Sequence, residues 1–228
     1  MGRVGRYHVY VTRPTTSSSA RLLRIAGRPA PGASQAPEGP PDAELARMAR
    51  EKDPRAATLV WNRYSGLVRG VLYRSVGPGH DIEDLAQDVF IGFFRNVGTL
   101  RDASSLRPFL VGIALRTAHT ALRKRRVRRW LHLSDDGSVP EVATTDGDPR
   151  TREAVQRLYG ILDKLPDRER LAFVLRHAEG HELTETAELL GVSLATVKRM
   201  LQRAEAHVQA CAQKDDLLSD WTDGGGDE

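Results

Sequence analysis

Residues 183–209 read LTETAELLGVSLATVKRMLQRAEAHVQ and predict two helices joined by a tight turn. Apolar side chains recur at three- and four-residue steps, including a stripe from Leu194 to Val208, as on the buried face of a helix. Gly191 can supply the turn, and Ser193 is placed to cap the following helix. Thr184 takes the equivalent capping position for the first helix. The stretch therefore predicts a helix-turn-helix.

The second of these helices has a polar face suited to DNA. Side chains that can bond phosphates or fit against base edges lie off its apolar stripe, which is how a recognition helix enters the major groove. An ordinary helical hairpin with a solvated basic face is the alternative that this spacing leaves open. The candidate DNA-binding residues are Ser193, Ala195, Thr196, Lys198, Arg199, Gln202 and Arg203.

The remaining sequence also favours helices. No run of alternating apolar and polar residues predicts a strand, so the fold class is all-α. Helical patterns cover about 42–52, 54–76, 81–96 and 108–130, and again 151–163, 167–178, 184–190 and 194–210. They predict two small helical domains, residues 41–132 and 151–211.

The segments outside these domains are polar and poor in large apolar residues. Residues 133–150 read as a flexible linker between the domains. A basic extension over residues 1–40 and an acidic tail over residues 212–228 are expected to be disordered, because neither composition can bury enough apolar surface to offset ordering entropy. One hypothesis is that the acidic tail folds back on the basic stretch 107–129 as an internal brake.

The formal charge of +4 is unevenly distributed along the 228 residues. Residues 1–40 hold six Arg against one Glu, so that extension carries +5 and the other residues sum to −1. A surface that binds a polyanion must therefore be a local patch. Residues 103–134 supply one, with eight bases and no acid.

Composition argues against several classes of protein. The lone Cys211 excludes an intramolecular disulfide and a multi-thiolate zinc site, and no metal or cofactor site is predicted. No apolar run is long enough for a membrane span, so we expect no membrane insertion and a cytoplasmic protein. Neither a glycine-rich phosphate loop nor a nucleophile arrangement is present, and we predict no catalytic residues and no enzyme.

The stretch Gly180–Lys198 closely resembles region four of sigma-70-type RNA polymerase sigma factors, particularly the extracytoplasmic-function (ECF) group. Leu165–Phe173 is similar to the helix that precedes it in that family. The resemblance implies that the candidate DNA-binding residues read the upstream (minus thirty-five) promoter element. The chain departs from the family at Arg199-Met200-Leu201, where Ser-Arg-Leu is usual.

Residues Asp81–Phe90 resemble region two of the same family, which docks on the clamp coiled coil of the polymerase's largest subunit. From the residues alone, carboxylates at a helix N-terminus are equally explained as groups that cap the helix and stabilise its dipole. The core-polymerase-binding residues implied by the resemblance are Asp81, Glu83, Asp84, Leu85, Gln87, Asp88 and Phe90.

Residues Arg107–Trp130 resemble the next family segment, which opens and holds the downstream (minus ten) element. The loop ahead of it, about Thr99–Ser105, corresponds to the one that receives an unstacked base. A solvated basic face or an RNA-binding patch is the alternative. The implied downstream DNA-binding residues are Arg107, Arg116, Arg123, Lys124, Arg125 and Arg126.

Together these stretches predict a bacterial sigma factor that binds core RNA polymerase and promoter DNA, with an anti-sigma factor as a further candidate partner and with nucleoid association through polymerase. The alternative is a helix-turn-helix transcriptional regulator that is no polymerase subunit. The first domain discriminates between them, since a regulator has no need for both an acidic docking helix and a basic melting segment.

Overall fold

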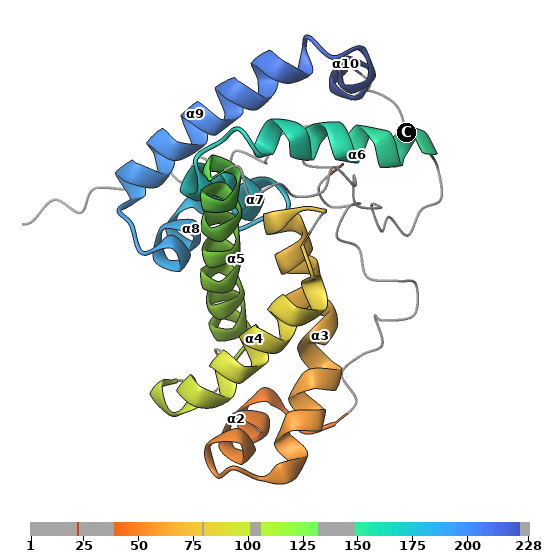
Figure 1. Cartoon of the computed structure of the whole chain (residues 1–228). Coiled ribbons are helices and arrows are strands. Elements are labelled where there is room, and N and C mark those ends of the chain that lie inside the picture. The colour runs from red at the N-terminus through yellow and green to blue at the C-terminus, as the bar shows by residue number, and fades with distance from the viewer. Residues whose placement is uncertain (1–21, 23–38, 79, 101–105, 132–148, 224–228) are drawn as a thin grey trace, which may run out of the picture.

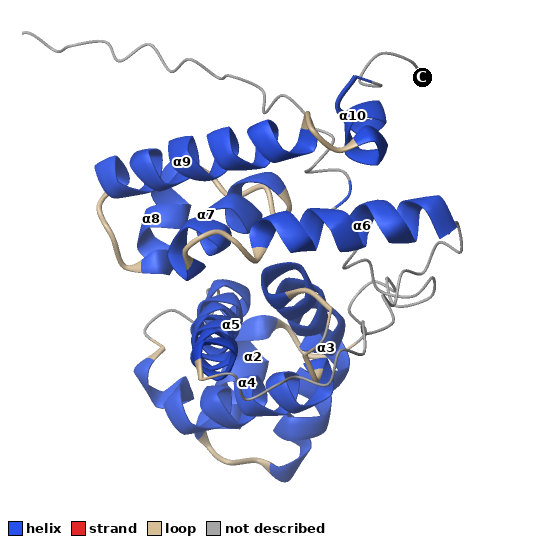
Figure 2. Ribbon diagram, turned by 45° about the horizontal axis from the view of Figure 1, so that its top comes forward, coloured by secondary structure: helices blue, strands red, loops and turns tan. Residues whose placement is uncertain are grey.

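The computed structural model describes residues 22, 39–78, 80–100, 106–131 and 149–223. Within these ranges the chain forms helices and no strand, which confirms the all-α class (Figures 1 and 2). No helix in the described ranges is both long and apolar enough to span a membrane.

The helices of the first domain begin where polar caps meet apolar stripes. Asp53 accepts a hydrogen bond from the backbone N–H of Arg55, and Pro54 occupies the first helical position of α3, where its missing N–H costs nothing. Asp81 caps α4 by accepting from the N–H of Asp84 at 3.0 Å. The elements are α2 (Asp42–Arg50), α3 (Pro54–Val76), α4 (Ile82–Asn96), a 3-10 turn (Val97–Thr99) and α5 (Leu106–Trp130).

The second domain contains the predicted helix-turn-helix. Gly191 ends α8 in the left-handed conformation, with φ of 63°, and the Ser193 side chain caps α9. The cap of α8 differs from the prediction: Glu182, rather than Thr184, precedes the helix and forms a reciprocal capping box with Glu185. The elements are α6 (Pro149–Leu162), α7 (Asp167–His177), α8 (Leu183–Leu190), α9 (Leu194–Ala212) and α10 (Asp216–Asp223).

The acidic tail is partly helical where the sequence predicts disorder. Helix α10 packs on α6 and α9, because Leu218 is buried in their apolar cluster and Asp215 pairs with Arg157 at 2.8 Å. These contacts hold the described tail residues against the second domain, and the structure does not support the brake on residues 107–129. Leu22, from the basic extension, is buried in the same cluster. The rest of residues 1–38 lies outside the described residues.

The two domains share an apolar contact that the sequence does not predict. Leu171 and Leu175 of α7 are buried in the cluster that forms the core of the first domain, and Leu189 packs against it from α8. Helix α7 lies against α3 and α5, as Figures 1 and 2 show. The expected linker falls almost wholly on residues 132–148, outside the described residues.

Candidate functional site

Two of the acidic residues at the start of α4 make structural contacts within the first domain. Asp81 is the helix cap, and Glu83 forms two hydrogen bonds with Arg69 of α3, at 2.7 and 2.8 Å. The capping interpretation therefore accounts for Asp81. Further along the helix, Asp84, Gln87 and Asp88 are exposed. They form the acidic and amide surface predicted to meet polymerase.

The apolar members of this predicted set have a different position. Leu85 is half-buried, and Phe90 is only 5% exposed. The Phe90 ring packs on Trp61 of α3, with ring centroids 4.8 Å apart and planes inclined by 48°. Phe90 thus belongs to the core and also forms part of the floor of a surface groove.

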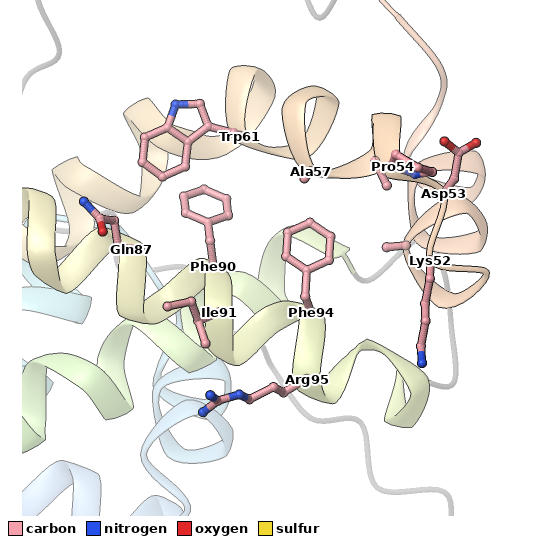
Figure 3. Close-up of a pocket in the computed structure, with 12 residues that line it drawn as sticks. Lys52, Asp53, Pro54, Ala57, Trp61, Gln87, Phe90, Ile91, Phe94 and Arg95 are labelled. Atoms are coloured by element: carbon pink, nitrogen blue, oxygen red, sulfur yellow. The ribbon is translucent and has the colours of Figure 1, made fainter.

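This groove has a volume of about 660 Å³ and lies between α3, α4 and the turn that joins α2 to α3. Trp61 points from α3 toward Phe90 on α4, and Phe94 lies beside Phe90 toward Pro54 (Figure 3). Gln87, from the acidic face, also lines the groove. The predicted docking helix therefore presents charge and an apolar hollow side by side.

Sequence reasoning missed the groove residues Trp61, Ile91 and Phe94 as a site. The available signal was Ile91, an apolar side chain off the buried stripe of α4, which is 47% exposed in the structure. In the local apolar pattern Trp61 and Phe94 look like ordinary core residues, because the pattern does not show that a surface groove exposes part of their side chains.

The basic face of α5 divides into two parts. Arg107, Arg116, Arg123 and Lys124 are exposed, as the DNA-binding prediction requires. Arg125 and Arg126 instead pair with acids of the second domain: Arg125 lies 3.4 Å from the Asp163 carboxylate and Arg126 2.9 Å from that of Asp167. Two cations of the predicted downstream surface are therefore paired with acids of the second domain, although 48% of the Arg126 side chain stays exposed.

Trp130 at the end of α5 was not among the predicted site residues. Its side chain is 79% exposed and follows the basic run, with Val127 and Leu131 also exposed nearby. Exposed aromatic rings next to cations are typical of surfaces that stack single-stranded bases. Residues 101–105 of the predicted base-receiving loop lie outside the described residues.

The recognition helix α9 presents its predicted face to solvent. Ala195, Lys198, Arg199 and Gln202 are exposed, and Thr196 is half-buried. The Thr196 hydroxyl accepts from Arg199 at 3.3 Å. This contact holds the guanidinium along the exposed face of the helix.

Ser193 and Arg203 of the predicted face also make contacts within the second domain, and Leu194 is more exposed than predicted. Ser193 is exposed, and its hydroxyl accepts from the N–H of Thr196 at 3.3 Å. Arg203 is exposed but reaches Glu169 of α7 at 3.4 Å. Leu194, predicted to be buried, is 38% exposed, because the cluster between α7, α8 and α9 includes Val197 but does not extend to Leu194.

Models of known families match both domains. Sigma-70 region 2 covers residues 60–128, and Sigma-70, region 4 covers residues 155–208. The first match contains α4 and nearly all of α5, and the second contains the helix-turn-helix.

Curated relatives agree with these matches. The ECF RNA polymerase sigma-E factor of Haemophilus influenzae is 27% identical over 177 residues, which cover 74% of this chain and 93% of the relative. The ferric citrate uptake sigma factor FecI of Escherichia coli is 29% identical over 154 residues, covering 65% and 86%.

Solved structures show the same fold. The structure of CnrH in complex with the cytosolic domain of CnrY matches with a TM-score of 0.55 and 25% identity, covering 77% of this chain and 99% of that one. The sigma factor RpoE of Bartonella quintana, solved with the anti-sigma factor NepR, matches in fold with a TM-score of 0.51 and 23% identity. This chain therefore belongs to the sigma-70 family of RNA polymerase sigma factors, in its ECF group.

Proposed function

We propose that this chain binds core RNA polymerase through the exposed face of α4 and the adjoining groove, and directs the enzyme to its promoters. The observation that carries this assignment is the juxtaposition on one helix of Asp84, Gln87 and Asp88 with the groove floored by Phe90. A basic helical partner would pair with the carboxylates and bury apolar side chains in the groove. Charge complementarity would guide the encounter, and the apolar contact would hold the complex.

In this proposal DNA meets the two remaining surfaces. The α9 face around Lys198 and Arg199 reads the upstream element as duplex, and the α5 face holds the downstream element as single strands. Strand opening then needs no covalent chemistry, because a surface that binds unpaired bases better than paired ones shifts the melting equilibrium. Trp130 supports this role, because its exposed ring follows the run of basic side chains on α5. The protein would act in the cytoplasm, on the nucleoid with polymerase.

The test reverses two charges on the proposed docking face. Asp84→Lys with Asp88→Lys is expected to abolish binding to purified core polymerase, since both carboxylates would face a basic partner with the wrong sign. Binding of the same variant to DNA should persist, because neither residue lies on α5 or α9. Co-elution with core polymerase and a DNA-binding titration measure the two effects.

A matched control makes the same change of charge elsewhere. Glu153→Lys with Asp216→Lys alters exposed residues on α6 and α10, and should leave polymerase binding intact. If the α4 variant binds polymerase as well as this control does, the docking assignment is wrong. If the native chain binds DNA but never core polymerase, the alternative of a separate helix-turn-helix regulator is correct.

An anti-sigma factor stays a predicted partner. The groove between α3 and α4 is the surface where such an inhibitor would compete most directly with polymerase, because the same residues would be buried by either partner. Competition between core polymerase and a candidate inhibitor for the native chain, with the Asp84→Lys, Asp88→Lys variant alongside, tests this directly.

A further inference from the structure

Glu169 is an acidic side chain that is buried within the second domain. It lies in the first turn of α7, where the helix N-terminus favours a negative charge. Its carboxylate also forms an ion pair with Arg203 of α9, with Oε1 3.4 Å from Nη1. A carboxylate is costly to bury unless a charged or hydrogen-bonding partner compensates it. The pair therefore links a buried acid of α7 to the recognition helix.

The two partners of this pair are exposed to very different degrees. The Arg203 side chain is 70% exposed, whereas the Glu169 side chain is 11% exposed. An ion pair between two exposed side chains contributes little, because both must be ordered to form it. Here the packing around Glu169 already fixes the carboxylate. The main effect of the pair is therefore to restrict where the Arg203 guanidinium lies.

Arg203 belongs to the exposed side of α9 that the proposed function places against the upstream element. Thr196, Arg199 and Arg203 are three and four residues apart, so they follow one side of the helix. Arg199 donates to the Thr196 hydroxyl of the same helix, whereas Arg203 is bonded to α7. Of these two arginines, Arg203 is the one whose position is set from outside the recognition helix.

The pair with Glu169 uses one nitrogen of the guanidinium. Nη1 faces the carboxylate, and the part of the chain that the structure describes supplies no other hydrogen bond to the Arg203 side chain. The edge formed by Nε and Nη2 keeps N–H donors in a fixed fork. Such an edge matches the O6 and N7 acceptors of guanine in the major groove, the commonest specific contact of arginine with DNA.

We propose that Glu169 is a positioning residue for sequence recognition: it holds Arg203 so that the free edge of the guanidinium reads a guanine in the upstream element. The proposal rests on the proposed function, because it takes α9 as the helix that enters the major groove. It names the base that Arg203 selects. It also adds a residue, outside the predicted DNA-binding set, on which that selection depends.

Glu169 has two opposing effects on DNA binding. Its negative charge repels phosphates, but the adjacent guanidinium offsets that charge, and salt at physiological strength screens what remains beyond about 8 Å. Holding the arginine in place avoids the cost of ordering a mobile side chain on binding, which corresponds to roughly 2- to 12-fold in affinity. The positioning effect is therefore the larger. Loss of Glu169 should weaken the selection of guanine rather than tighten binding to all DNA.

Selection from a library of duplexes with a randomised central segment measures this preference without a known promoter. The full chain is mixed with the library, and the bound duplexes are sequenced. The native chain should favour guanine at one position by roughly 5- to 150-fold over other bases. Glu169→Leu suits a buried site but removes the acceptor for Nη1. It should reduce this preference by about 2- to 12-fold and leave the preferences at other positions unchanged.

A matched control removes an acid from the same helix-turn-helix. Glu188→Gln takes one exposed carboxylate from α8 and should leave every preference as in the native chain. Glu169→Gln keeps an acceptor for Nη1 at the buried site, and should retain part of the guanine preference that Glu169→Leu loses. Circular dichroism confirms helical folding in each variant.

A double-mutant cycle separates positioning from a structural role. The native chain, Glu169→Leu, Arg203→Lys and the combined variant are each titrated with the selected duplex and with one in which an A·T pair replaces the selected G·C pair. Lysine cannot present the forked edge, so Arg203→Lys should itself lose the discrimination. If Glu169 acts through Arg203, Glu169→Leu should then cause no further loss. An equal further loss in the Arg203→Lys background overturns the positioning role.

Two other results would also overturn the proposal. A native chain that favours no guanine contradicts the base assignment, and a Glu169→Leu variant that keeps the full preference or binds all duplexes more tightly contradicts the positioning. The selection uses no polymerase. A chain that selects guanine but does not bind core polymerase would therefore contradict the proposed function alone, and a chain that binds polymerase without this preference would contradict the role of Glu169 alone.

Discussion

Gly77 lies in the contact between the two domains, against the ring of Tyr159. It ends α3 with a φ of 74°, and a Cβ placed there would lie 2.5 Å from Cδ1 of Tyr159. Two features disfavour any residue other than glycine at this position: the positive φ, and the contact that a Cβ would make with the Tyr159 ring. The glycine that ends α3 is therefore also a requirement of the interface.

We predict that Gly77→Ala lowers the free energy of unfolding by roughly 1–3 kcal/mol and increases the radius of gyration, because the added methyl group strains the turn and displaces Tyr159. Gly66→Ala is the control: Gly66 lies inside α3 with open space where a Cβ would point, so alanine there should stabilise the helix by about 0.5–1 kcal/mol. Chemical denaturation measures both changes. Equal stability of the two variants would contradict the close approach at Gly77.

His80 makes the same interface sensitive to pH. Burial lowers the pKa of its imidazole to about 4, with Arg125 and Arg170 adding to the shift and Asp163 opposing it. Protonation is therefore disfavoured in the closed molecule. As the pH falls below about 6.5, the open or unfolded chain binds a proton that the closed chain does not, so the closed form loses stability.

The loss should approach about 1.4 kcal/mol for each pH unit between roughly 6 and 4. Scattering and denaturation at pH 7 and pH 5 measure it on the native chain, and His80→Gln should remove this part of the pH dependence. A native chain that is as closed and as stable at pH 5 as at pH 7 would show that His80 does not titrate against the interface.

At the scale of helices, local sequence chemistry predicted most of the fold. The cap at Ser193, the glycine at 191 and the helical patterns 54–76 and 81–96 gave element boundaries within about two residues of the structure. The start of α8 differs because a reciprocal glutamate box can replace a hydroxyl cap, and both patterns occur in the sequence there. The run Leu171–Leu175 carried a neglected signal, since a helix that is apolar on all sides must be buried between neighbours.

The recognition helix depends on its cap. Ser193→Ala removes the side-chain acceptor for the N–H of Thr196, and should lower the free energy of unfolding by about 1 kcal/mol. Ser65→Ala, inside α3, makes the same chemical change away from a helix end and should be neutral or slightly stabilising. Thermal unfolding separates the two variants. No difference between them would mean that the Ser193 hydroxyl contributes nothing to the start of α9.

Helix α10, in the acidic tail, was not predicted from the sequence. Its composition is acidic, yet Leu217 and Leu218 give it one apolar edge, and only the presence of α6 and α9 makes burial of that edge favourable. We predict that Leu218→Ala destabilises the second domain by about 2–3 kcal/mol, whereas Leu194→Ala, at an exposed apolar position, has little effect on stability. Similar denaturation midpoints for both variants would show that α10 does not dock.

At the scale of the whole molecule, the near-neutral charge beyond residue 40 conceals one acidic surface, on α4, and two basic surfaces, on α5 and α9. Helix α4, which carries the acidic face and lines the groove, lies toward one end of the structure and α9 toward the other, with α5 between them (Figure 1). Sequence periodicity could locate each surface but not their relation. Arg170 and Ser75 are 95 residues apart in the chain, and no local pattern encodes their contact.

The central claim is that this chain gives core RNA polymerase its choice of promoter. The most direct measurement is transcription of genomic DNA from the source bacterium by purified core polymerase, with and without the chain, followed by sequencing of the RNA 5′ ends. We predict a discrete set of start sites that requires the chain and is lost with Asp84→Lys and Asp88→Lys. The same unspecific starts with and without the chain, although it is folded and bound to polymerase, would contradict the account.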